Sequence, residues 1–227
     1  MVPLSTIDYF VNPQDTRKAF DRAASSYDAG ADLQREVADR LYRRLDYIDI
    51  DPGVVLDLGC GTGYPTRFLG ERFTQSQLIA LDLAYAMAST VSKRCKRFDH
   101  LSCINADAQS LPLRDESVDL IYSSLALQWS NDLSKALSEL KRVLKPGGVC
   151  LLATLGDGTL TELAQAWQAV DAYSHVNHFI SIEELGDQLY GAGFLQTVVD
   201  ADTITLEYST VMGLMRDLKT IGASNRT

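Results

Sequence analysis

Apolar and polar positions along the 227-residue chain change their period near Pro52. Before this point apolar residues recur at helical spacing, which predicts two helices, over 15–25 and 33–45. After it, short apolar runs alternate with amphipathic segments, a pattern typical of βα units around a mostly parallel sheet. The runs predict strands at 54–58, 78–83, 101–105, 118–123 and 149–155. The segments between them predict helices at 66–73, 85–98 and 133–144.

After residue 155 the apolar runs and amphipathic segments no longer alternate regularly. A loop and a helix are expected to form a lid at 156–180, followed by a helix at 183–190, an antiparallel-type strand at 203–208 and a helix at 211–218. We therefore expect one domain over 1–227. Its predicted parts are N-terminal helices at 1–51, a core at 52–155, the lid at 156–180 and a C-terminal part at 181–227.

Composition narrows the function classes only a little. The formal charge of −9 disfavours nucleic-acid binding, because phosphate contacts need clustered lysine and arginine. No apolar run is long enough to cross a membrane and the first residues do not resemble a signal peptide, so we expect a cytoplasmic protein without a membrane partner. The four scattered cysteines predict reduced thiols and no metal site: Cys60, Cys95, Cys103 and Cys150.

The stretch VVLDLGCGTGYPTRFL at 54–69 ends the first predicted strand in a turn with three alternating glycines, Gly59, Gly61 and Gly63. In an open parallel sheet the first strand-to-helix turn is the usual place for a ligand. Dinucleotide sites carry G-x-G-x-x-G, whereas this turn reads G-x-G-x-G, so its spacing disfavours NAD. A lone copy of such a turn can also be purely structural. The neighbouring residues therefore decide whether this turn is expected to bind a ligand.

Two acidic residues follow the next strands. Asp82 ends the second strand and Asp107 follows the third, so both are expected at the same sheet edge as the glycine turn. A carboxylate in the position of Asp82 can accept both ribose hydroxyls of a nucleotide. The alternative is that Asp82 only caps the helix after it.

Four segments together resemble the class I S-adenosylmethionine-dependent methyltransferases: VLDLGCGTG, ALDLAYAM, NADAQSLPLRDESVDLIYSSLALQW and LKRVLKPGG. The likeness spans residues 52–155. It implies a Rossmann-like α/β fold with a mostly parallel, doubly wound sheet. It also implies S-adenosylmethionine as the cofactor and S-adenosylhomocysteine as the product.

The same resemblance implies a role for each part of the sheet edge. The glycine turn would pass close to the methionine part of the cofactor, with Asp57 supporting the turn or reaching the methionine amino group. The acidic residue after the second strand would hold the ribose, and the one after the third would meet the adenine. The segment after the fourth strand would close over the sulfonium. The cofactor-binding residues so implied are Asp57, Gly59, Cys60, Gly61, Gly63, Asp82, Leu83, Asp107, Ala108, Leu125 and Gln128.

Segments at 19–41, 158–185 and 218–225, outside this core, are similar to the malonyl-acyl carrier protein O-methyltransferase family of biotin biosynthesis. That family methylates the free carboxyl of a malonyl thioester, and a carboxylate needs no general base because it is already ionised at neutral pH. The resemblance implies that Tyr27 donates a hydrogen bond at the acceptor site and that Phe179 walls it. Either residue could instead be ordinary packing.

The implied partner, malonyl-acyl carrier protein, is strongly acidic, so a basic docking patch is expected. Each candidate cluster could equally be the solvated face of a helix. The candidates are Arg40, Arg43, Arg44, Lys93, Arg94, Lys96, Arg97, Lys141, Arg142 and Lys145.

Two other functions stay open on the sequence. The first is another small-molecule methyltransferase of the same class, acting on a quinone precursor, another carboxylic acid or a sterol. The second is a module that binds S-adenosylmethionine or a carrier protein without catalysis. Methyltransferases of this class usually close with an antiparallel hairpin, and the chain holds no candidate for its last strand, so we expect a fragment or an open sheet edge. We expect a monomer.

Overall fold

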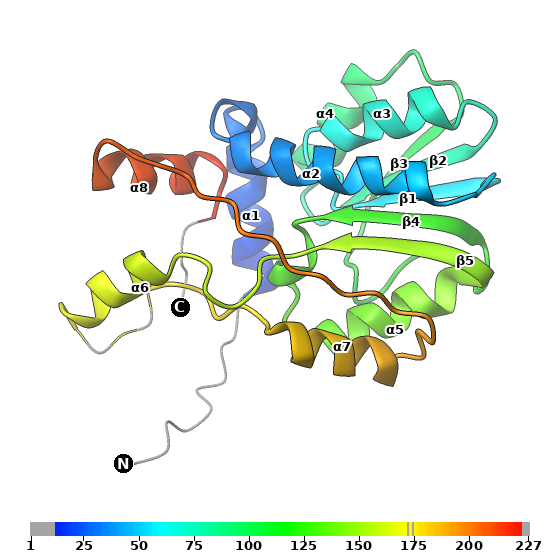
Figure 1. Cartoon of the computed structure of the whole chain (residues 1–227). Helices are drawn as coiled ribbons and strands as arrows, with labels where there is room; N and C mark the ends of the chain where they lie inside the picture. Colours follow the sequence, from blue (N-terminus) through cyan, green and yellow to red (C-terminus); the bar gives the residue numbers. More distant parts are fainter. Residues whose placement is uncertain (1–11, 172, 174, 224–227) are drawn as a thin grey trace.

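A computed structural model describes residues 12–171, 173 and 175–223 (Figure 1). Its centre is one five-stranded sheet in the order β3-β2-β1-β4-β5, in which every neighbouring pair is parallel. The connection order reverses between β1 and β4, which is where open α/β sheets bind ligands. The strands are β1 Val54–Leu58, β2 Gln77–Asp82, β3 Leu101–Asn105, β4 Val118–Ser124 and β5 Leu144–Ala153.

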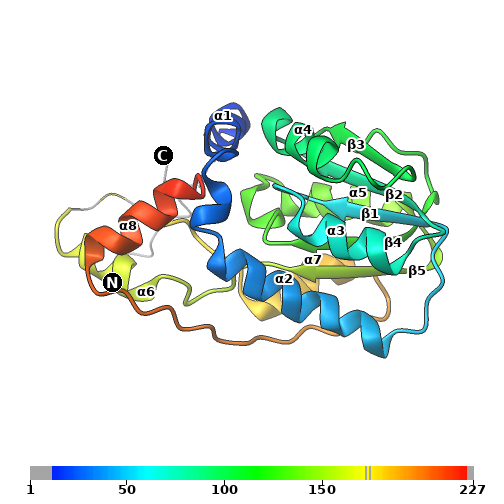
Figure 2. The ribbon, with the colours of Figure 1, turned by 90° about the horizontal axis from the view of Figure 1, so that it is seen from above.

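Helices cover both faces of the sheet (Figure 2). The helices α2, α3 and α4 pack on one face, while α5 packs on the other and carries α7 outside it. The helices before and within the sheet region are α1 Pro13–Ala23, α2 Asp32–Arg44, α3 Tyr64–Arg72, α4 Tyr85–Arg94 and α5 Leu133–Val143. Three short 3-10 turns are η1 Tyr27–Ala29, η2 Leu45–Tyr47 and η3 Leu127–Trp129.

Alternation along β4 explains the two-sided core. Ile121 packs into the cluster on the α5 side, whereas Leu120 and Tyr122 pack into the cluster under α2 and α3. The Tyr122 side chain is completely buried, and its hydroxyl donates to the Ala38 carbonyl of α2 at 2.7 Å. This bond satisfies the only polar atom of a large buried ring and ties the second N-terminal helix to the centre of the sheet.

The C-terminal third is held more loosely. It consists of α6 Thr161–Gln168, α7 Ile182–Gly191 and α8 Val211–Thr220. Residues 192–210, here called the connecting segment, run from α7 past α2 to α8 (Figures 1 and 2). Asp200 and Asp202 of this segment form ion pairs with Arg44 and Arg40 of α2. The helix α8 then meets the N-terminal region, where the Ser26 hydroxyl donates to the Thr220 carbonyl at 3.3 Å.

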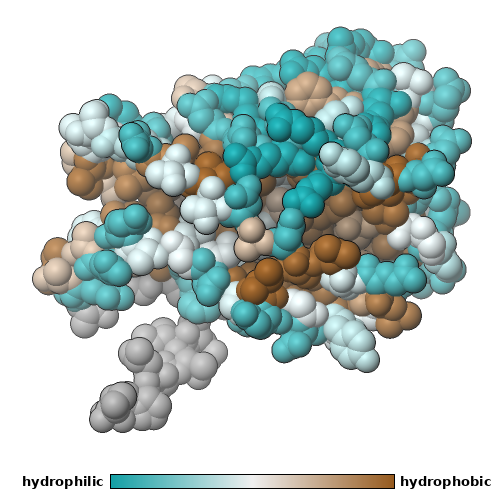
Figure 3. All heavy atoms as spheres, viewed as in Figure 1, coloured by the Kyte–Doolittle hydropathy of each residue, from teal (hydrophilic) through white to brown (hydrophobic). Residues whose placement is uncertain are grey.

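The fold class, the mostly parallel sheet and the two N-terminal helices are confirmed. The antiparallel-type strand predicted at 203–208 is wrong, because these residues have no strand partner and most of their side chains are exposed. Alternating residues form a strand only where one face can be buried, and the contacts that the segment makes with α2 just before this stretch, at Asp200 and Asp202, are ionic. On the face seen in Figure 3 apolar surface appears near the connecting segment, where Leu195 and Val198 are exposed.

Two boundaries also differ from the sequence prediction. The helix expected at 85–98 ends at Arg94, where the Cys95 amide closes the last turn on the Val91 carbonyl. The strand expected at 149–155 begins at Leu144 and ends at Ala153, so the Lys-Pro-Gly-Gly run at 145–148 lies inside β5. The β4–β5 register shifts between Val118 and Leu120, so this strand takes up proline and two glycines at an irregularity of the edge strand.

Candidate active site

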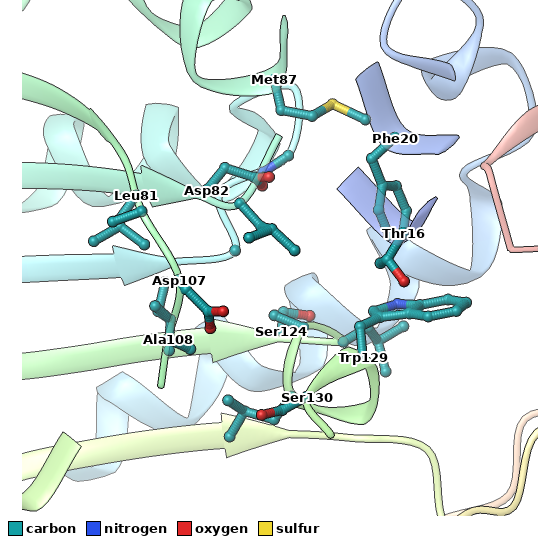
Figure 4. A pocket seen from close by; sticks show the side chains of 18 of the residues that line it. Thr16, Phe20, Leu81, Asp82, Met87, Asp107, Ala108, Ser124, Trp129 and Ser130 are labelled. Atoms are coloured by element: carbon teal, nitrogen blue, oxygen red, sulfur yellow. The ribbon is translucent and has the colours of Figure 1, made fainter. Parts of the chain in front are cut away.

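A cavity with about 730 Å³ of empty space, part of it open to solvent, lies at the carboxyl edge of the sheet (Figure 4). Its floor comes from the ends of β1 to β4 and the residues just after them, and its cover comes from α1 and η1. The carboxyl edge of an open α/β sheet is the usual place for a small-molecule ligand. It is lined by Thr16, Phe20, Tyr27, Leu58, Gly59, Gly61, Leu81, Asp82, Leu83, Met87, Ala106, Asp107, Ala108, Ser124, Leu125, Ala126, Leu127, Trp129 and Ser130.

The glycine turn after β1 needs glycine for two separate reasons. Gly59, Gly61 and Gly63 all have positive φ, at 71°, 54° and 91°, a region that other residues seldom adopt. A Cβ on Gly59 would also lie 2.2 Å from the Cβ of Ala126, so the turn touches the segment after β4. The amides of residues 59 and 60 donate to the Leu81 carbonyl at 2.8 and 3.1 Å, which fixes the turn against β2.

Asp82 is held by the main chain in a position to accept further hydrogen bonds. Its Oδ2 accepts from the Gly61 amide at 2.9 Å and its Oδ1 from the Ala84 amide at 2.8 Å. A carboxylate oxygen has two acceptor positions, so each oxygen keeps one beyond these two bonds. Burial raises the pKa of Asp82 to about 6, although both amide bonds favour the ionised form.

Asp57 supports the turn from below and does not line the cavity. It is buried at the end of β1 and accepts from the Thr66 hydroxyl of α3 at 2.6 Å. Burial raises the pKa of Asp57 to about 7 against the effect of this hydrogen bond, and the nearby Asp82 adds to the rise. The interaction joins the strand before the glycine turn to the helix after it.

Asp107 and Ala108 line the end of the cavity that follows β3. The Asp107 carboxylate accepts from the Gln109 amide at 2.9 Å, which shapes the turn after the strand. Thr16 and Trp129 lie at the opposite end (Figure 4). The cavity is therefore elongated along the sheet edge, with Asp82 and the glycine turn between its ends.

The segment after β4 is strained and incompletely hydrogen-bonded. Leu125 has φ of 53°, unusual for a leucine, and is held there by the Gln128 side-chain amide, which donates to its carbonyl at 2.9 Å. The Ser124 hydroxyl and the Gln128 amide oxygen are buried without a hydrogen-bond partner. Strain and unsatisfied polar atoms of this kind cluster at functional sites.

The cover of the cavity is aromatic. Phe20 of α1 meets the Trp129 ring edge to face, with ring centroids 5.3 Å apart. Tyr27 of η1 lines the same cavity. Burial raises the pKa of Tyr27 above its ordinary value, with further contributions from Asp82 and Asp28, so its hydroxyl stays protonated and able to donate.

Asp28 fastens this cover to the carboxyl edge of the sheet. Its carboxylate accepts from the Thr62 hydroxyl in the glycine turn at 2.5 Å and pairs with Arg94 of α4 at 2.6 Å. Burial opposes ionisation of this group, but the hydrogen bonds from Thr62 and Arg94 hold the pKa of Asp28 below its ordinary value. On the other side, Arg35 of α2 donates to the Asp28 carbonyl at 2.8 Å.

The structure brings eight of the predicted site residues to the cavity wall. Asp57, Cys60, Gly63 and Gln128 lie next to it without lining it, and Phe179 is not among the lining residues. Phe179 precedes Ile180, which forms a bridge with Gly156. The eight lining residues are Tyr27, Gly59, Gly61, Asp82, Leu83, Asp107, Ala108 and Leu125.

Sequence reasoning missed several lining residues. Thr16 and Phe20 stand one helical turn apart on α1, and this spacing was the available signal that one face of the helix serves the cavity. Met87 of α4 and Ser124 at the end of β4 gave no signal, because each fits an ordinary helix or strand pattern.

Most cations in the expected docking clusters are paired within the chain. Arg40 and Arg44 pair with the connecting segment, Arg97 with Glu71, and Lys145 with Asp119. Arg94 and Arg142 also have carboxylate partners. A docking patch built from these clusters stays a prediction. Among the described residues no helix could span a membrane, and no group of potential metal ligands occurs.

Comparisons with known proteins agree with this geometry. A family model described as a methyltransferase domain matches residues 56–152. A malonyl-acyl-carrier protein O-methyltransferase of Nitrosospira multiformis is 43% identical, over 97% of this chain and 77% of the relative. The protein of the same name from Halorhodospira halophila is 46% identical, over 92% and 71%.

Solved structures show the same fold. One is the methyltransferase in a complex with the Haloferax volcanii activator Trm112, with a TM-score of 0.65 and 25% identity over 91% of this chain and 93% of the other. Another is a methyltransferase from Thermotoga maritima, with a TM-score of 0.58 and 23% identity over 78% and 80%.

Proposed function

The chain belongs to the malonyl-acyl-carrier protein O-methyltransferase family, and we propose that it transfers a methyl group from S-adenosylmethionine to the free carboxylate of malonyl-acyl carrier protein. The product would be the malonyl methyl ester used in biotin synthesis. The observation that carries the proposal is the elongated cavity, which runs from Asp107 past Asp82 and the glycine turn to a covered end beyond β4.

The residues along this cavity fit S-adenosylmethionine. Asp82 keeps one acceptor position on each carboxylate oxygen, which suits the two hydroxyls of a ribose. Gly59 and Gly61, which both have positive φ, carry no side chain where the methionine part would approach the backbone. Asp107 and Ala108 at the far end suit the adenine.

The bound cofactor supplies an electrophilic methyl group on a positively charged sulfur. In the proposed step a carboxylate oxygen forms a bond to the methyl carbon, the carbon–sulfur bond breaks, and its electron pair stays on sulfur. No proton moves. The protein therefore has to align the oxygen with the methyl group and exclude water, and such alignment contributes on the order of 7–11 kcal/mol in favourable cases.

The lining residues agree with a reaction that needs no general base. Of the described residues that line the cavity none is histidine, and the Tyr27 hydroxyl is kept protonated. A hydroxyl or amine acceptor would have to lose a proton, whereas a malonyl carboxylate arrives ionised. This chemistry supports the carboxylate over the quinone-precursor and sterol acceptors.

We assign Tyr27 to the acceptor end as a hydrogen-bond donor and keep Phe179 as a wall residue. The position of Tyr27 in the cover supports its role. Phe179 lies outside the lining, so its role requires this side chain to approach the cavity when the acceptor binds.

The direct test is transfer of labelled methyl from S-adenosylmethionine to malonyl-acyl carrier protein, with acetyl-acyl carrier protein as the control. Acetyl lacks the free carboxyl. We expect label on the malonyl form only, released by mild alkali as expected of an ester. Cofactor binding without transfer to either form would favour another acceptor or a non-catalytic module.

Tyr27→Phe tests the assigned donor. We expect kcat/KM for malonyl-acyl carrier protein to fall roughly tenfold or more, because a hydrogen bond to a charged group contributes about 1.5–3 kcal/mol. The dissociation constant of S-adenosylhomocysteine should stay within about twofold. Tyr47→Phe is the control, since Tyr47 is 88% exposed and lies outside the cavity lining. Equal kinetics for the two variants would refute the role of Tyr27.

A further inference from the structure

The end of the cavity beyond the glycine turn offers hydroxyl groups and no cation. Of the described residues that line the cavity, none is lysine, arginine or histidine, and Asp82 and Asp107 add negative charge. Besides Tyr27, the hydroxyls belong to Thr16, Ser124 and Ser130 (Figure 4). An anionic acceptor entering here must therefore be held by neutral hydrogen-bond donors of the protein.

Ser124 is the hydroxyl that the fold itself leaves unsatisfied. Its Oγ is buried without a partner, whereas the neighbouring Ser123 hydroxyl donates to the Leu58 carbonyl at 2.9 Å. The Ser130 hydroxyl likewise donates to the Asp132 carbonyl, at 3.2 Å. An unpaired buried hydroxyl is unfavourable in a folded protein, so its retention at a cavity wall points to a partner supplied by a ligand.

The order of the strands places Ser124 at the acceptor end. Asp107 follows β3, Asp82 ends β2 and the glycine turn follows β1, so in the proposed binding mode the adenine, ribose and methionine parts of the cofactor would take these positions in turn. The next strand is β4. Because Ser123 pairs with Leu58, Ser124 stands level with Gly59 and therefore one strand beyond the methionine part.

The backbone around Ser124 is fixed. The Leu125 amide donates to the Ala153 carbonyl of β5 at 2.8 Å, and the left-handed conformation of Leu125 ends the strand immediately after Ser124. Alternation along β4 places Ser124 on the same face as Tyr122, which is the face covered by α2. The backbone that carries the hydroxyl is therefore held by the sheet and not by a flexible loop.

We propose that the Ser124 hydroxyl donates a hydrogen bond to one oxygen of the acceptor carboxylate and so directs the other oxygen at the methyl group. This inference rests on the proposed function and names the residue that binds its substrate. A neutral donor binds the carboxylate without pairing its charge, so the free oxygen keeps its nucleophilicity. An arginine in this position would hold the carboxylate more tightly and make it less reactive.

The test is calorimetric binding of malonyl- and acetyl-acyl carrier protein to the protein loaded with sinefungin, an unreactive cofactor analogue with an amine near the methyl position. We expect Ser124→Ala to bind malonyl-acyl carrier protein roughly tenfold to a hundredfold more weakly than the unsubstituted protein, with acetyl-acyl carrier protein unaffected. Ser124→Thr keeps the hydroxyl and should restore most of the malonyl affinity. Ser123→Ala removes a neighbouring hydroxyl that is bonded internally, so it should lower the melting temperature and leave malonyl affinity unchanged.

Three results would overturn the inference. The first is that Ser124→Ala weakens the binding of sinefungin as much as the binding of malonyl-acyl carrier protein, which would assign the hydroxyl to the cofactor. The second is that Ser124→Ala loses affinity equally for malonyl- and acetyl-acyl carrier protein. The third is that it loses affinity for neither. If the unsubstituted protein bound malonyl- and acetyl-acyl carrier protein equally and methylated neither, the proposed function would fail first, and this inference with it.

Discussion

At the scale of single residues, the glycine turn is limited by a steric contact as well as by backbone conformation. A Cβ at Gly59 would overlap Ala126, 2.2 Å away, whereas a Cβ at Gly147, which also has positive φ, would meet no atom within 4 Å. Gly147→Ala should therefore cost only about 1–2 kcal/mol, the cost of the left-handed conformation.

Gly59→Ala should cost more than Gly147→Ala and should abolish S-adenosylhomocysteine binding. Thermal unfolding and calorimetry of the two variants side by side check this expectation. If both variants lost the same free energy of unfolding and still bound S-adenosylhomocysteine, the close approach between the glycine turn and the segment after β4 would not be needed for ligand binding.

The Asp82 carboxyl predicts a pH dependence of cofactor affinity. Its pKa is about 6 in the free protein because it is buried, and the ribose hydroxyls need an ionised acceptor. Affinity should therefore be full near pH 8 and fall as the pH drops through 6, by about tenfold at pH 5. Asp57, with a pKa of about 7, also titrates nearby, and the charge of Asp21 contributes to the raised pKa of Asp82.

The measurement is the dissociation constant of S-adenosylhomocysteine between pH 5 and 8 for the unsubstituted protein and for Asp82→Asn. Asp82→Asn should bind more weakly at pH 8 and show a much flatter profile. A profile that keeps its full slope in the variant would assign the titration to Asp57 instead.

Sequence motifs identified the residues that the main chain itself requires, and missed those defined by contacts distant in the sequence. Gly59 and Asp82 stand at fixed offsets from strand ends, so their place at the sheet edge could be predicted. Ser124 could not, because nothing in the sequence shows that Ser123 finds an internal partner and Ser124 does not. Phe179 was inferred from resemblance alone, and no local pattern indicated the bridge that holds Ile180 against Gly156.

At the scale of elements, the α1–η1 cover is attached to the site by Asp28. The contacts with Thr62 and Arg94 join η1 to the glycine turn and to α4. Asp28→Asn should loosen the cover, so backbone amides of α1 and η1 should exchange hydrogen faster and S-adenosylhomocysteine should bind roughly tenfold more weakly. Hydrogen exchange with mass spectrometry measures both regions in one experiment.

Asp32→Asn is the matched control. Asp32 carries the same charge four residues later, and its side chain is 85% exposed and paired only with Arg35 in the described structure. An exposed pair of this kind contributes at most about 1 kcal/mol. If Asp32→Asn loosened the cover as much as Asp28→Asn, loss of net charge rather than loss of the attachment would be the cause.

The elements with buried residues on one face were the ones that periodicity predicted well. The five strands and α5 each contribute to the core clusters, so their hydrophobic pattern is dictated by burial. The residues at 203–208 alternate in the same way without a face to bury, and the same pattern therefore led to a wrong strand. A period is informative only where a packing surface exists, and the sequence does not display that surface.

At the scale of the whole molecule, stability should fall from the sheet toward the C-terminal helices. The strands β1, β2 and β4 and the helix α5 contain completely buried residues, whereas α6 and α8 contain no buried residue. Hydrogen exchange should be slowest in β1 and β4 and fastest in α6 and α8. Adding S-adenosylhomocysteine should slow exchange in α1 and η1 and leave α8 nearly unchanged.

A strong ligand effect on α8 would contradict this order and would couple the C-terminal helix to the cavity. The contact that could carry such coupling is the Ser26 hydroxyl on the Thr220 carbonyl, so Ser26→Ala is the variant that would remove it. If the two are not coupled, S-adenosylhomocysteine should slow hydrogen exchange in α1 of Ser26→Ala as much as in α1 of the unsubstituted protein.

Because Trp129 contacts Phe20 in the cavity cover, the intrinsic fluorescence of this tryptophan can also report on the cavity. The chain has two tryptophans, and the other, Trp167, stacks on His175 with ring centroids 4.1 Å apart, away from the cavity lining. Trp129 therefore reports on the filling of the cavity and Trp167 on the surroundings of α6. With Trp167→Phe, emission from the remaining indole would follow cofactor entry and closure of the cover in real time, without any attached dye.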